Sequence, residues 1–413
     1  MAKEYDLLLF GCTGYTGALA IEHLSTKRQL KWAVSARSTE RAQAILTSKG
    51  CDGINIEMAD LVAAQQNDQA YEQLRAILKK TSCAISTAGP FDKYGKALVA
   101  LCAEEGVHYA DITGQTDFFR EMIREHDAVA RETGANIVCH CGNDCIPWDL
   151  TVLEMHDYAR ARGAHLKSVT TYTEVPDSGA GGAASGGTLT PARGPLAKSR
   201  DAASRAKVVD PLLRTADGAA SEYKTKVTSP KSNVRVVEFR RSAGPWVMGP
   251  VMANCIRRSN ALNGYAKGLV YSEALLRPTS WSAWAHDKLN TALFAGALYF
   301  SPLRRFLYQP GEGPTRAELE ASFLTLHGRG VMVDPTSGAE TELSSTYHFD
   351  EDTGYLDTAK MLVEAGIMLA RGEGSGSIGG GVATPAVVLG AALTKRLEVE
   401  LGAKLTLGER VAK

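Results

Sequence analysis

Short apolar runs alternate with helical patterns along the first 150 residues of the chain. Six runs have the length of β-strands, at residues 5–10, 32–36, 54–59, 83–87, 107–111 and 136–139. The stretches between them carry apolar residues at helical spacing, as at 68–80 and 117–133. Strands and helices that alternate at this rhythm form an open parallel sheet with helices on both faces. We therefore predict an α/β fold whose N-terminal domain, residues 1–150, is a Rossmann-like doubly wound parallel sheet.

The pattern changes near residue 150. Residues 168–173, residues 233–239 and several runs within 318–349 alternate between apolar and polar positions, which is typical of strands in a mixed or antiparallel sheet. We predict a second, α+β domain over residues 151–352 that is built on a mixed sheet and supplies the substrate floor. Domains of this kind often form oligomer interfaces, so a homodimer is one expectation.

The C-terminal residues, 353–413, carry two further helical patterns. These cover 356–370 and 386–397, and the glycine-rich stretch 379–385 is expected to turn the chain between them. Pro385 suits the first turn of a helix. No Gly-Lys-Ser/Thr follows these glycines, which excludes a nucleoside triphosphate loop.

Three stretches of the middle region fit neither domain pattern. Residues 178–187 are too rich in glycine for a regular element and form either a solvated linker or a loop that closes over substrate. Residues 197–232 are polar and predict a surface insertion. The apolar run 291–300 is shorter than the roughly 20 residues of a membrane span. It is either a core helix, or a lipid-facing patch or acyl-channel wall.

The turn after the first apolar run carries glycines at G-x-x-G-x-x-G spacing. Gly11 would let the chain turn off the strand, Gly14 would let a pyrophosphate approach the backbone, and Gly17 would let the following helix pack close to the strand. The free N–H groups of the helix start would face the phosphates. Thr13 and Tyr15 lie within this turn and are expected to contact the cofactor. A glycine turn without a ligand is the alternative.

The end of the second apolar run indicates which nicotinamide cofactor is bound. NAD sites usually place Asp or Glu about 20 residues past the glycines, to hold the ribose 2′-hydroxyl. This chain has Arg37 and Ser38 there, and no acid before Glu40. A guanidinium pairs bidentately with a 2′-phosphate, and a hydroxyl adds a donor. We therefore predict NADPH rather than NADH, with a solvated surface arginine as the alternative.

Other strand ends complete the expected site, because ligands of open α/β sheets bind at the carboxyl ends of the strands. Asp60 is expected near the adenine, or else as a helix N-cap. Ala88, Gly89 and Pro90 are expected on the nicotinamide side. Tyr94 is the candidate catalytic residue, whose phenol would reach the reacting centre. A half-buried loop aromatic is the alternative for Tyr94.

Composition narrows the class of protein. The 46 Lys and Arg residues balance 46 Asp and Glu residues, so nothing indicates a nucleic-acid partner. The N-terminus has no secretory apolar region, and the eight cysteines are dispersed, which suits a reducing, cytoplasmic compartment. Cys139, His140, Cys141 and Cys145 are a candidate metal cluster. However, no C-x-x-C pair or distant partner completes a ligand set, so we expect packed free thiols and no metal.

A set of short motifs, spread over nearly the whole chain, matches one known pattern. They are 11–17, 36–38, 88–91 with Tyr94 and Gly95, 109–114, 141–142 with 146–147, 185–188, 257–262, 310–314 and 381–385. Together they resemble the saccharopine dehydrogenase-like oxidoreductases, and within them the trans-acting enoyl reductases of polyketide and lipid biosynthesis.

This resemblance implies an NADPH-dependent reductase that acts on an enoyl thioester carried by a separate synthase. It also implies that the C-terminal helices pack back on the dinucleotide-binding domain. Two departures from the family pattern lie at strand ends that face the expected site. The family usually has Glu where this chain has Gln115, and an aromatic residue and Ser where it has Asn143 and Cys145. Because both departures face the expected site, they could change which substrate is bound or whether the protein is active.

Three functions fit these observations. The first is hydride transfer to an α,β-unsaturated acyl or polyketide thioester. No Tyr-x-x-x-Lys motif is present, so Tyr94 or solvent would supply the proton. The second is imine reduction of the saccharopine-reductase type, which needs clustered cations such as Arg257 and Arg258. The third is a non-catalytic NADPH-binding protein associated with a lipid-droplet or membrane surface.

Overall fold

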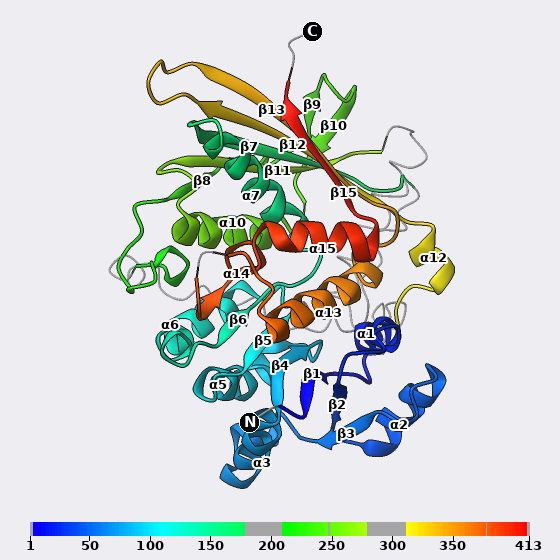
Figure 1. The fold of residues 1–413 in the computed structure, drawn as a ribbon. Helices are drawn as coiled ribbons and strands as arrows, with labels where there is room; N and C mark the ends of the chain where they lie inside the picture. The colour runs from blue at the N-terminus through cyan, green and yellow to red at the C-terminus, as the bar shows by residue number, and fades with distance from the viewer. Residues whose placement is uncertain (1–2, 178–208, 247, 279–310, 377, 411–413) are drawn as a thin grey trace.

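Two sheets organise the chain, and C-terminal helices lie between them (Figure 1). The computed structural model describes residues 3–177, 209–246, 248–278, 311–376 and 378–410. The glycine-rich stretch 178–187 and the apolar run 291–300 lie outside the described residues.

The first sheet has seven parallel strands in the order β14-β6-β5-β4-β1-β2-β3. The strands are β1 (Tyr5–Phe10), β2 (Trp32–Ala36), β3 (Asn55–Met58), β4 (Thr81–Ser86), β5 (His108–Asp111), β6 (Asn136–Val138) and β14 (Gly381–Ala383). The prediction of a doubly wound parallel sheet is confirmed, because β1 to β6 follow the strand order of a Rossmann fold.

Both faces of this sheet are covered, which explains why its strands are continuously apolar. Leu7 and Leu9 of β1 point to one layer, Leu8 and Phe10 to the other, and all four are at most 1% exposed. The helices of one layer are α3 (Asp68–Lys79), α5 (Lys96–Glu104) and α6 (Thr116–Thr133). Those of the other layer are α1 (Tyr15–Ser25), α2 (Thr39–Ser48) and α13 (Leu356–Arg371).

Strand β14 corrects the sequence prediction, which expected only a turn at this point. It pairs in parallel with β6, and Val382 lies opposite Ile137. Gly380 and Gly381 adopt φ angles of 103° and 110°, which side chains rarely tolerate. A strand of three residues is too short to show an alternating pattern in the sequence. Strand β14 is therefore recognised only from its pairing with β6.

The second sheet is mixed, as the sequence predicts. Its order is β15-β13-β12-β7-β11-β10-β9, and β8 also pairs with β11. The strands are β7 (His165–Glu174), β8 (Thr225–Val227), β9 (Val234–Val236), β10 (Arg241–Gly244), β11 (Leu269–Leu276), β12 (Leu324–Val333), β13 (Glu340–Phe349) and β15 (Lys404–Glu409). Strand β7 is parallel to β11 and antiparallel to β12. Helices α7 (Ile146–Arg160) and α10 (Gly249–Asn263) pack on this sheet.

Residues 209–232 differ from the predicted surface insertion. Leu212, in the short helix η3 (Pro211–Leu213), is fully buried against the core of the first sheet. Strand β8 then adds to the second sheet, so this segment connects the two sheets. The helical pattern at 386–397 is also divided, into α14 (Pro385–Val388) and α15 (Ala391–Leu401), because Gly390 takes a φ of 61° between them.

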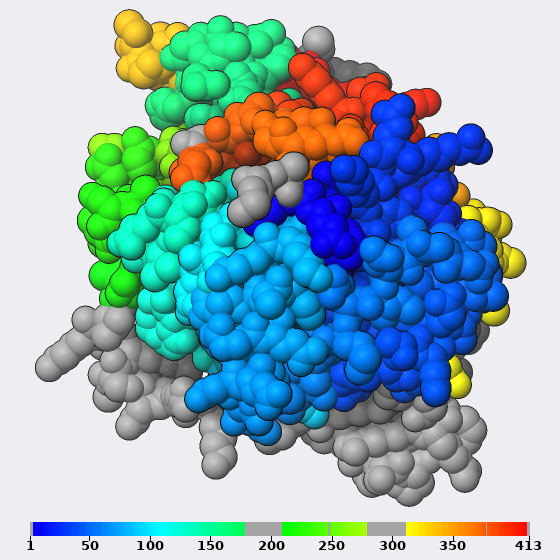
Figure 2. All heavy atoms as spheres, turned by 60° about the horizontal axis from the view of Figure 1, so that its bottom comes forward, coloured from blue at the N-terminus to red at the C-terminus, as the bar shows by residue number. Residues whose placement is uncertain are grey.

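The C-terminal residues contribute a strand to each of the two sheets. Helix α13 packs on β1, β4 and β5, while β14 joins the first sheet and β15 the second. Figure 2 shows these residues, coloured orange to red, lying directly against the blue N-terminal residues.

All eight cysteines are buried free thiols. Within the described part of the chain, no helix is both long and apolar enough to cross a membrane.

Candidate cofactor and substrate site

The glycine turn between β1 and α1 has the close packing that its spacing predicts. Gly11 turns the chain off the strand with a φ of 85°. A Cβ atom on Gly17 would lie only 2.2 Å from the carbonyl oxygen of Gly11, so the helix can approach the turn only because this residue is glycine.

The start of α1 fits a phosphate group. Gly14 is its N-cap, and no side chain caps the first turn, so the helix N–H groups are available to an anion. A Cβ atom on Gly14 would meet only the Gly11 carbonyl oxygen, at 3.4 Å, which leaves the outer side of the turn open. Thr13 is half-buried in the same turn. These residues would hold the pyrophosphate of NADPH, whose nicotinamide supplies the hydride of a reduction.

Tyr15 ties this turn to two distant segments. Its hydroxyl donates a hydrogen bond to the carbonyl oxygen of Pro314, and its ring meets the ring of Tyr355 edge-on at 5.4 Å. A Cβ atom on Gly313 would lie 2.6 Å from the Tyr15 ring. The segment before α12 (Arg316–Glu320) and the residue before α13 therefore pack against the Tyr15 side chain at the start of α1.

Arg37 and Ser38 lie at the end of β2, beside the glycine turn. Arg37 is exposed, and none of the carboxylates that the structure describes pairs with it. The Ser38 hydroxyl oxygen accepts from the Arg41 N–H at 3.3 Å and caps α2, which leaves the Ser38 O–H free to donate. An unpaired guanidinium beside a hydroxyl and a helix start fits a 2′-phosphate.

Asp60 follows β3 on the same edge of the sheet. Its Oδ1 atom accepts from the N–H groups of Val62 and Ala63, at 2.8 and 3.1 Å, just before the short helix η1 (Ala63–Gln65). The carboxylate therefore caps this turn, which was one of the two roles expected for it. Its proximity to adenine stays a prediction.

The loop after β4 is held by a residue from the next strand. Ala88, Gly89 and Pro90 form this loop, which leads into the short helix α4 (Phe91–Tyr94). The Gln115 side chain, from the end of the β5 loop, accepts hydrogen bonds from the first two N–H groups of α4. This role needs only acceptor oxygens, which Gln and Glu both supply, so the departure at Gln115 preserves the contact.

Tyr94 stands apart from the cavity described below. It is half-buried, packs against the α3 and α5 side of the sheet, and has the Lys93 ammonium 5.2 Å from its ring centre. It does not line the cavity at the ends of β5 and β6. Its catalytic role stays a prediction.

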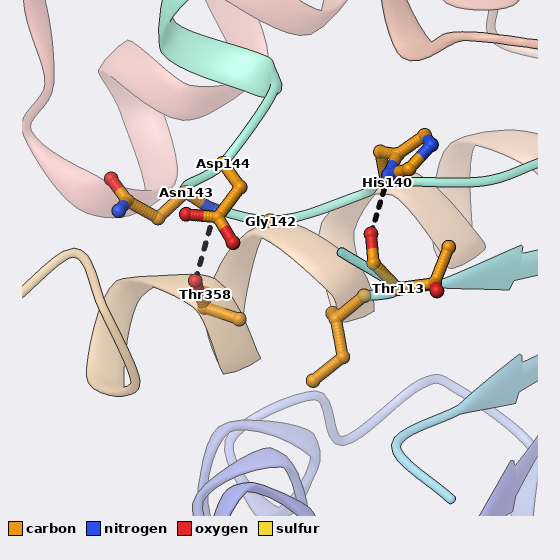
Figure 3. A pocket seen from close by; sticks show the side chains of 7 residues that line it. Thr113, His140, Gly142, Asn143, Asp144 and Thr358 are labelled. Atoms are coloured by element: carbon orange, nitrogen blue, oxygen red, sulfur yellow. Dashed lines mark hydrogen bonds between the residues drawn. The ribbon is translucent and has the colours of Figure 1, made fainter. Parts of the chain in front are cut away.

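A small cavity lies at the carboxyl ends of β5 and β6, where they meet the first turn of α13 (Figure 3). Its volume is about 40 Å³, enough for a single functional group or a few waters. It is lined by Ile112, Thr113, His140, Gly142, Asn143, Asp144 and Thr358. The nicotinamide half of a dinucleotide lies on this side of β1 in doubly wound sheets.

The wall of the cavity is fixed by buried hydrogen bonds. His140 has a φ of 64°, which is uncommon for residues other than glycine. Its backbone N–H donates to Asp111, and its ring Nδ1–H donates to the Thr113 carbonyl oxygen. Burial lowers the pKa of His140 to about 4, so the ring is neutral. It packs edge-on against Phe119 at 4.7 Å and holds the shape of the loop.

Asp144 is the unusual group of this cavity. Burial raises the pKa of its carboxyl to about 6, and it accepts no hydrogen bond from any residue that the structure describes. A Cβ atom on Gly114 would lie 3.6 Å from Asp144 Oδ2 and 3.2 Å from Met248 Cε, so a residue of the middle region packs against Gly114 on the Asp144 side of the loop. The sequence marked 141–147 as a strand end at the site but did not single out Asp144, because its burial depends on distant segments.

The other departure from the family pattern, at Asn143 and Cys145, lies on either side of Asp144 in the chain. The Asn143 backbone N–H donates to Thr358 Oγ1 at 2.9 Å, which fastens the loop to α13. Cys145 is fully buried, and burial raises the pKa of its thiol well above the usual value. Neither change removes a donor or acceptor that holds the cavity wall.

Comparison with known proteins agrees with this geometry. The family model of the saccharopine dehydrogenase NADP binding domain matches residues 7–138. A trans-acting enoyl reductase of Mycobacterium bovis is 30% identical over 98% of both chains. A Mycobacterium tuberculosis protein provisionally named as a trans-acting enoyl reductase is 32% identical over 96% of both. The chain belongs to the saccharopine dehydrogenase-like oxidoreductases.

This oxidoreductase is an NADPH-dependent enzyme of that family, in the group that includes the trans-acting enoyl reductases. Its fold is that of apo saccharopine dehydrogenase (L-Glu forming) from Saccharomyces cerevisiae, with a TM-score of 0.56 at 13% identity over 98% of this chain and 99% of that one. The family model of an NADP binding domain confirms the predicted cofactor, NADPH. The contacts of the individual cofactor-binding residues stay predictions.

Proposed function

We propose that this saccharopine dehydrogenase-like oxidoreductase is a trans-acting enoyl reductase. It reduces the carbon–carbon double bond of an α,β-unsaturated acyl or polyketide thioester that a separate synthase carries. The observation that supports this proposal most is the similarity over nearly the whole chain to proteins named for that activity.

The chemistry of the site is compatible with this reaction. NADPH supplies a hydride to the β-carbon of the thioester. The uncapped start of α1 and the Arg37 guanidinium would bind the phosphates, and the Gln115 side chain would fix the loop on the nicotinamide side. The cavity at the ends of β5 and β6 then has room for one polar group of the substrate.

Imine reduction is less well supported. A substrate with several carboxylates needs free cations, and Arg258 was a candidate for that role. The Arg258 side chain is fully buried and donates to the carbonyl oxygens of Arg214 and Val382, at 2.6 and 2.8 Å. It therefore connects the middle region to β14 and is not available to a substrate.

The experiment measures NADPH oxidation with crotonyl and longer enoyl thioesters, each offered on coenzyme A and on an acyl carrier domain. We expect oxidation of NADPH and a product that has gained two hydrogen atoms by mass spectrometry. Faster turnover on the carrier domain would support delivery by a synthase. Turnover of an imine with no turnover of any enoyl thioester would contradict the proposal.

A further inference from the structure

The cavity at the ends of β5 and β6 offers few proton donors. His140 is neutral, and its ring N–H is bonded to the Thr113 carbonyl oxygen. The Thr358 hydroxyl donates to the Thr353 carbonyl oxygen, at 2.7 Å. Threonine hydroxyls and asparagine amides do not release protons at neutral pH. Of the side chains that line the cavity, only the Asp144 carboxyl is able to give up a proton.

The surroundings of Asp144 keep its carboxyl available to a ligand. A buried carboxylate normally accepts several hydrogen bonds, as Asp111 does here from Tyr109, Thr113 and His140. Asp144 lies one loop away and accepts none from the described residues. In Figure 3 its carboxylate extends from the loop toward the first turn of α13, beside Thr358. The Asp144 carboxyl is half-buried, lines the cavity and has no partner among the described residues, so a ligand in the cavity could complete its hydrogen bonds.

The loop that carries Asp144 is held rigidly. The Asn143 N–H is bonded to Thr358 Oγ1, and a Cβ atom on Gly142 would lie 3.0 Å from Thr358 Cγ2. On the other side, Asp111 Oδ1 accepts from the backbone N–H of His140 at 3.1 Å. A catalytic side chain needs surrounding hydrogen bonds and packing of this kind to hold it in position.

We propose that Asp144 is the general acid of this reductase, and this inference rests on the proposed enoyl reduction. The hydride of NADPH forms a C–H bond at the β-carbon, and the electrons of the double bond move to the α-carbon and the thioester oxygen. The α-carbon then takes the proton of the Asp144 carboxyl, whose O–H bonding electrons stay on the carboxylate. NADPH is oxidised to NADP⁺, the thioester is reduced, and water reprotonates Asp144.

The electrostatics agree with this role. A pKa of about 6 leaves part of the carboxyl protonated at neutral pH, near the value at which a general acid works best. Two titratable groups adjoin the Asp144 carboxyl. His140 lines the same cavity, and the thiol of Cys255 on α10 has a pKa that is raised first by burial and then by nearby charges that include Asp144. Asp111 ends β5, and Asp357 lies in the first turn of α13 beside Thr358. Burial keeps His140 neutral and raises the pKa of the other three groups, so none of the four supplies a positive charge that would keep Asp144 ionised.

The first test replaces the proton donor while keeping its shape. Asp144→Asn should lower kcat with an enoyl thioester by about 100-fold or more, while NADPH affinity and thermal unfolding stay as in the wild type. Wild-type kcat/KM should fall as pH rises above about 6, because the acid form is needed, and the variant should lose this limb. Asp117→Asn, an exposed carboxylate on α6, is the matched control and should behave as the wild type.

The second test does not depend on turnover. Carbon-13 NMR of carboxyl-labelled aspartate, with the Asp144→Asn spectrum as the assignment, should show a carboxyl that titrates near pH 6. A midpoint near 4 or below, the ordinary range of aspartate, would overturn the proposal. Full activity of Asp144→Asn beside an inactive Tyr94→Phe would also overturn it, in favour of the phenol.

The two proposals fail in different ways. A wild-type enzyme that reduces no enoyl thioester contradicts the enoyl substrate, and the carboxyl titration then decides alone whether the cavity holds a proton donor. A wild-type enzyme that reduces enoyl thioesters, together with an equally active Asp144→Asn, leaves the enoyl reductase in place and removes Asp144 from its mechanism.

Discussion

Gln115 Oε1 lies 2.6 Å from the backbone nitrogen of Phe91 and also accepts from the next N–H of α4, at 3.2 Å. A single amide oxygen at the end of the β5 loop thus caps the helix that follows the β4 loop. Two strand ends on the nicotinamide side of the sheet are held together by this contact.

Replacement of Gln115 should separate these strand ends. Gln115→Leu leaves the partly buried N–H of Phe91 and the exposed N–H of Asp92 without this acceptor, so we expect the free energy of unfolding to fall by about 1–2 kcal/mol and NADPH affinity to weaken. Gln115→Glu keeps the acceptor and should match the wild type near neutral pH. Urea denaturation and cofactor titration measure both, and a Gln115→Leu protein as stable as the wild type would show that the contact is dispensable.

Arg37 should determine the choice between the two nicotinamide cofactors. Arg37→Ala removes the unpaired guanidinium at the end of β2, so NADPH should bind at least about tenfold more weakly, a loss of about 1.4 kcal/mol, while NADH binding stays the same. Calorimetric titration with both cofactors measures this. Arg28→Ala, another exposed arginine that follows α1, is the control. Equal losses for both cofactors would contradict a 2′-phosphate contact.

Gly17 should tolerate no side chain. In Gly17→Ala the new Cβ atom would meet the Gly11 carbonyl oxygen at 2.2 Å, and backbone on both sides would have to move. We expect a loss of about 2 kcal/mol or more in stability, together with loss of NADPH binding. Gly53→Ala is the matched control, since no atom lies within 4 Å of its Cβ position. Similar behaviour of the two variants would refute the packing argument.

Glu364 on α13 should make stability depend on acid pH. Burial raises its pKa, but hydrogen bonds from His23, Lys27 and Arg396 outweigh this and lower the pKa to about 2. A carboxylate whose pKa is lowered by folding stabilises the protein at pH values above the pKa of the same group in the unfolded chain, which is 4.5 for Glu364. That contribution, about 3 kcal/mol, is lost as pH falls from about 4.5 toward 2.

Glu364→Gln should therefore lower stability near neutral pH and flatten the acid dependence. Thermal or urea unfolding at several pH values measures the effect. Glu72→Gln, in an exposed ion pair with Arg75, is the control and should change stability by less than about 1 kcal/mol. An unchanged pH profile in Glu364→Gln would mean that the three partners do not act through this carboxylate.

The local pattern of apolar and polar residues was enough to predict the two sheets. The features that it did not predict depend on contacts between segments that are distant in the sequence. The apolar run of β1 and the spacing of Gly11 and Gly17 depend on neighbouring residues, so the sequence displays them directly. Strand β14 and the isolation of Asp144 depend on segments more than a hundred residues away. Asp60 lies between these cases, because its sequence position allows either a cap or an adenine contact and only the fold shows the cap.

The place of β14 at the edge of the first sheet has a consequence for synthesis on the ribosome. Its partner β6 is translated long before it, and at roughly 5–20 residues per second the wait is on the order of 10–50 s. Throughout that interval the outer backbone groups of β6 have no partner in the nascent chain. A chaperone that shields this open edge should therefore raise the yield of the enzyme in cells, and shortening the chain before residue 381 should leave an aggregating product.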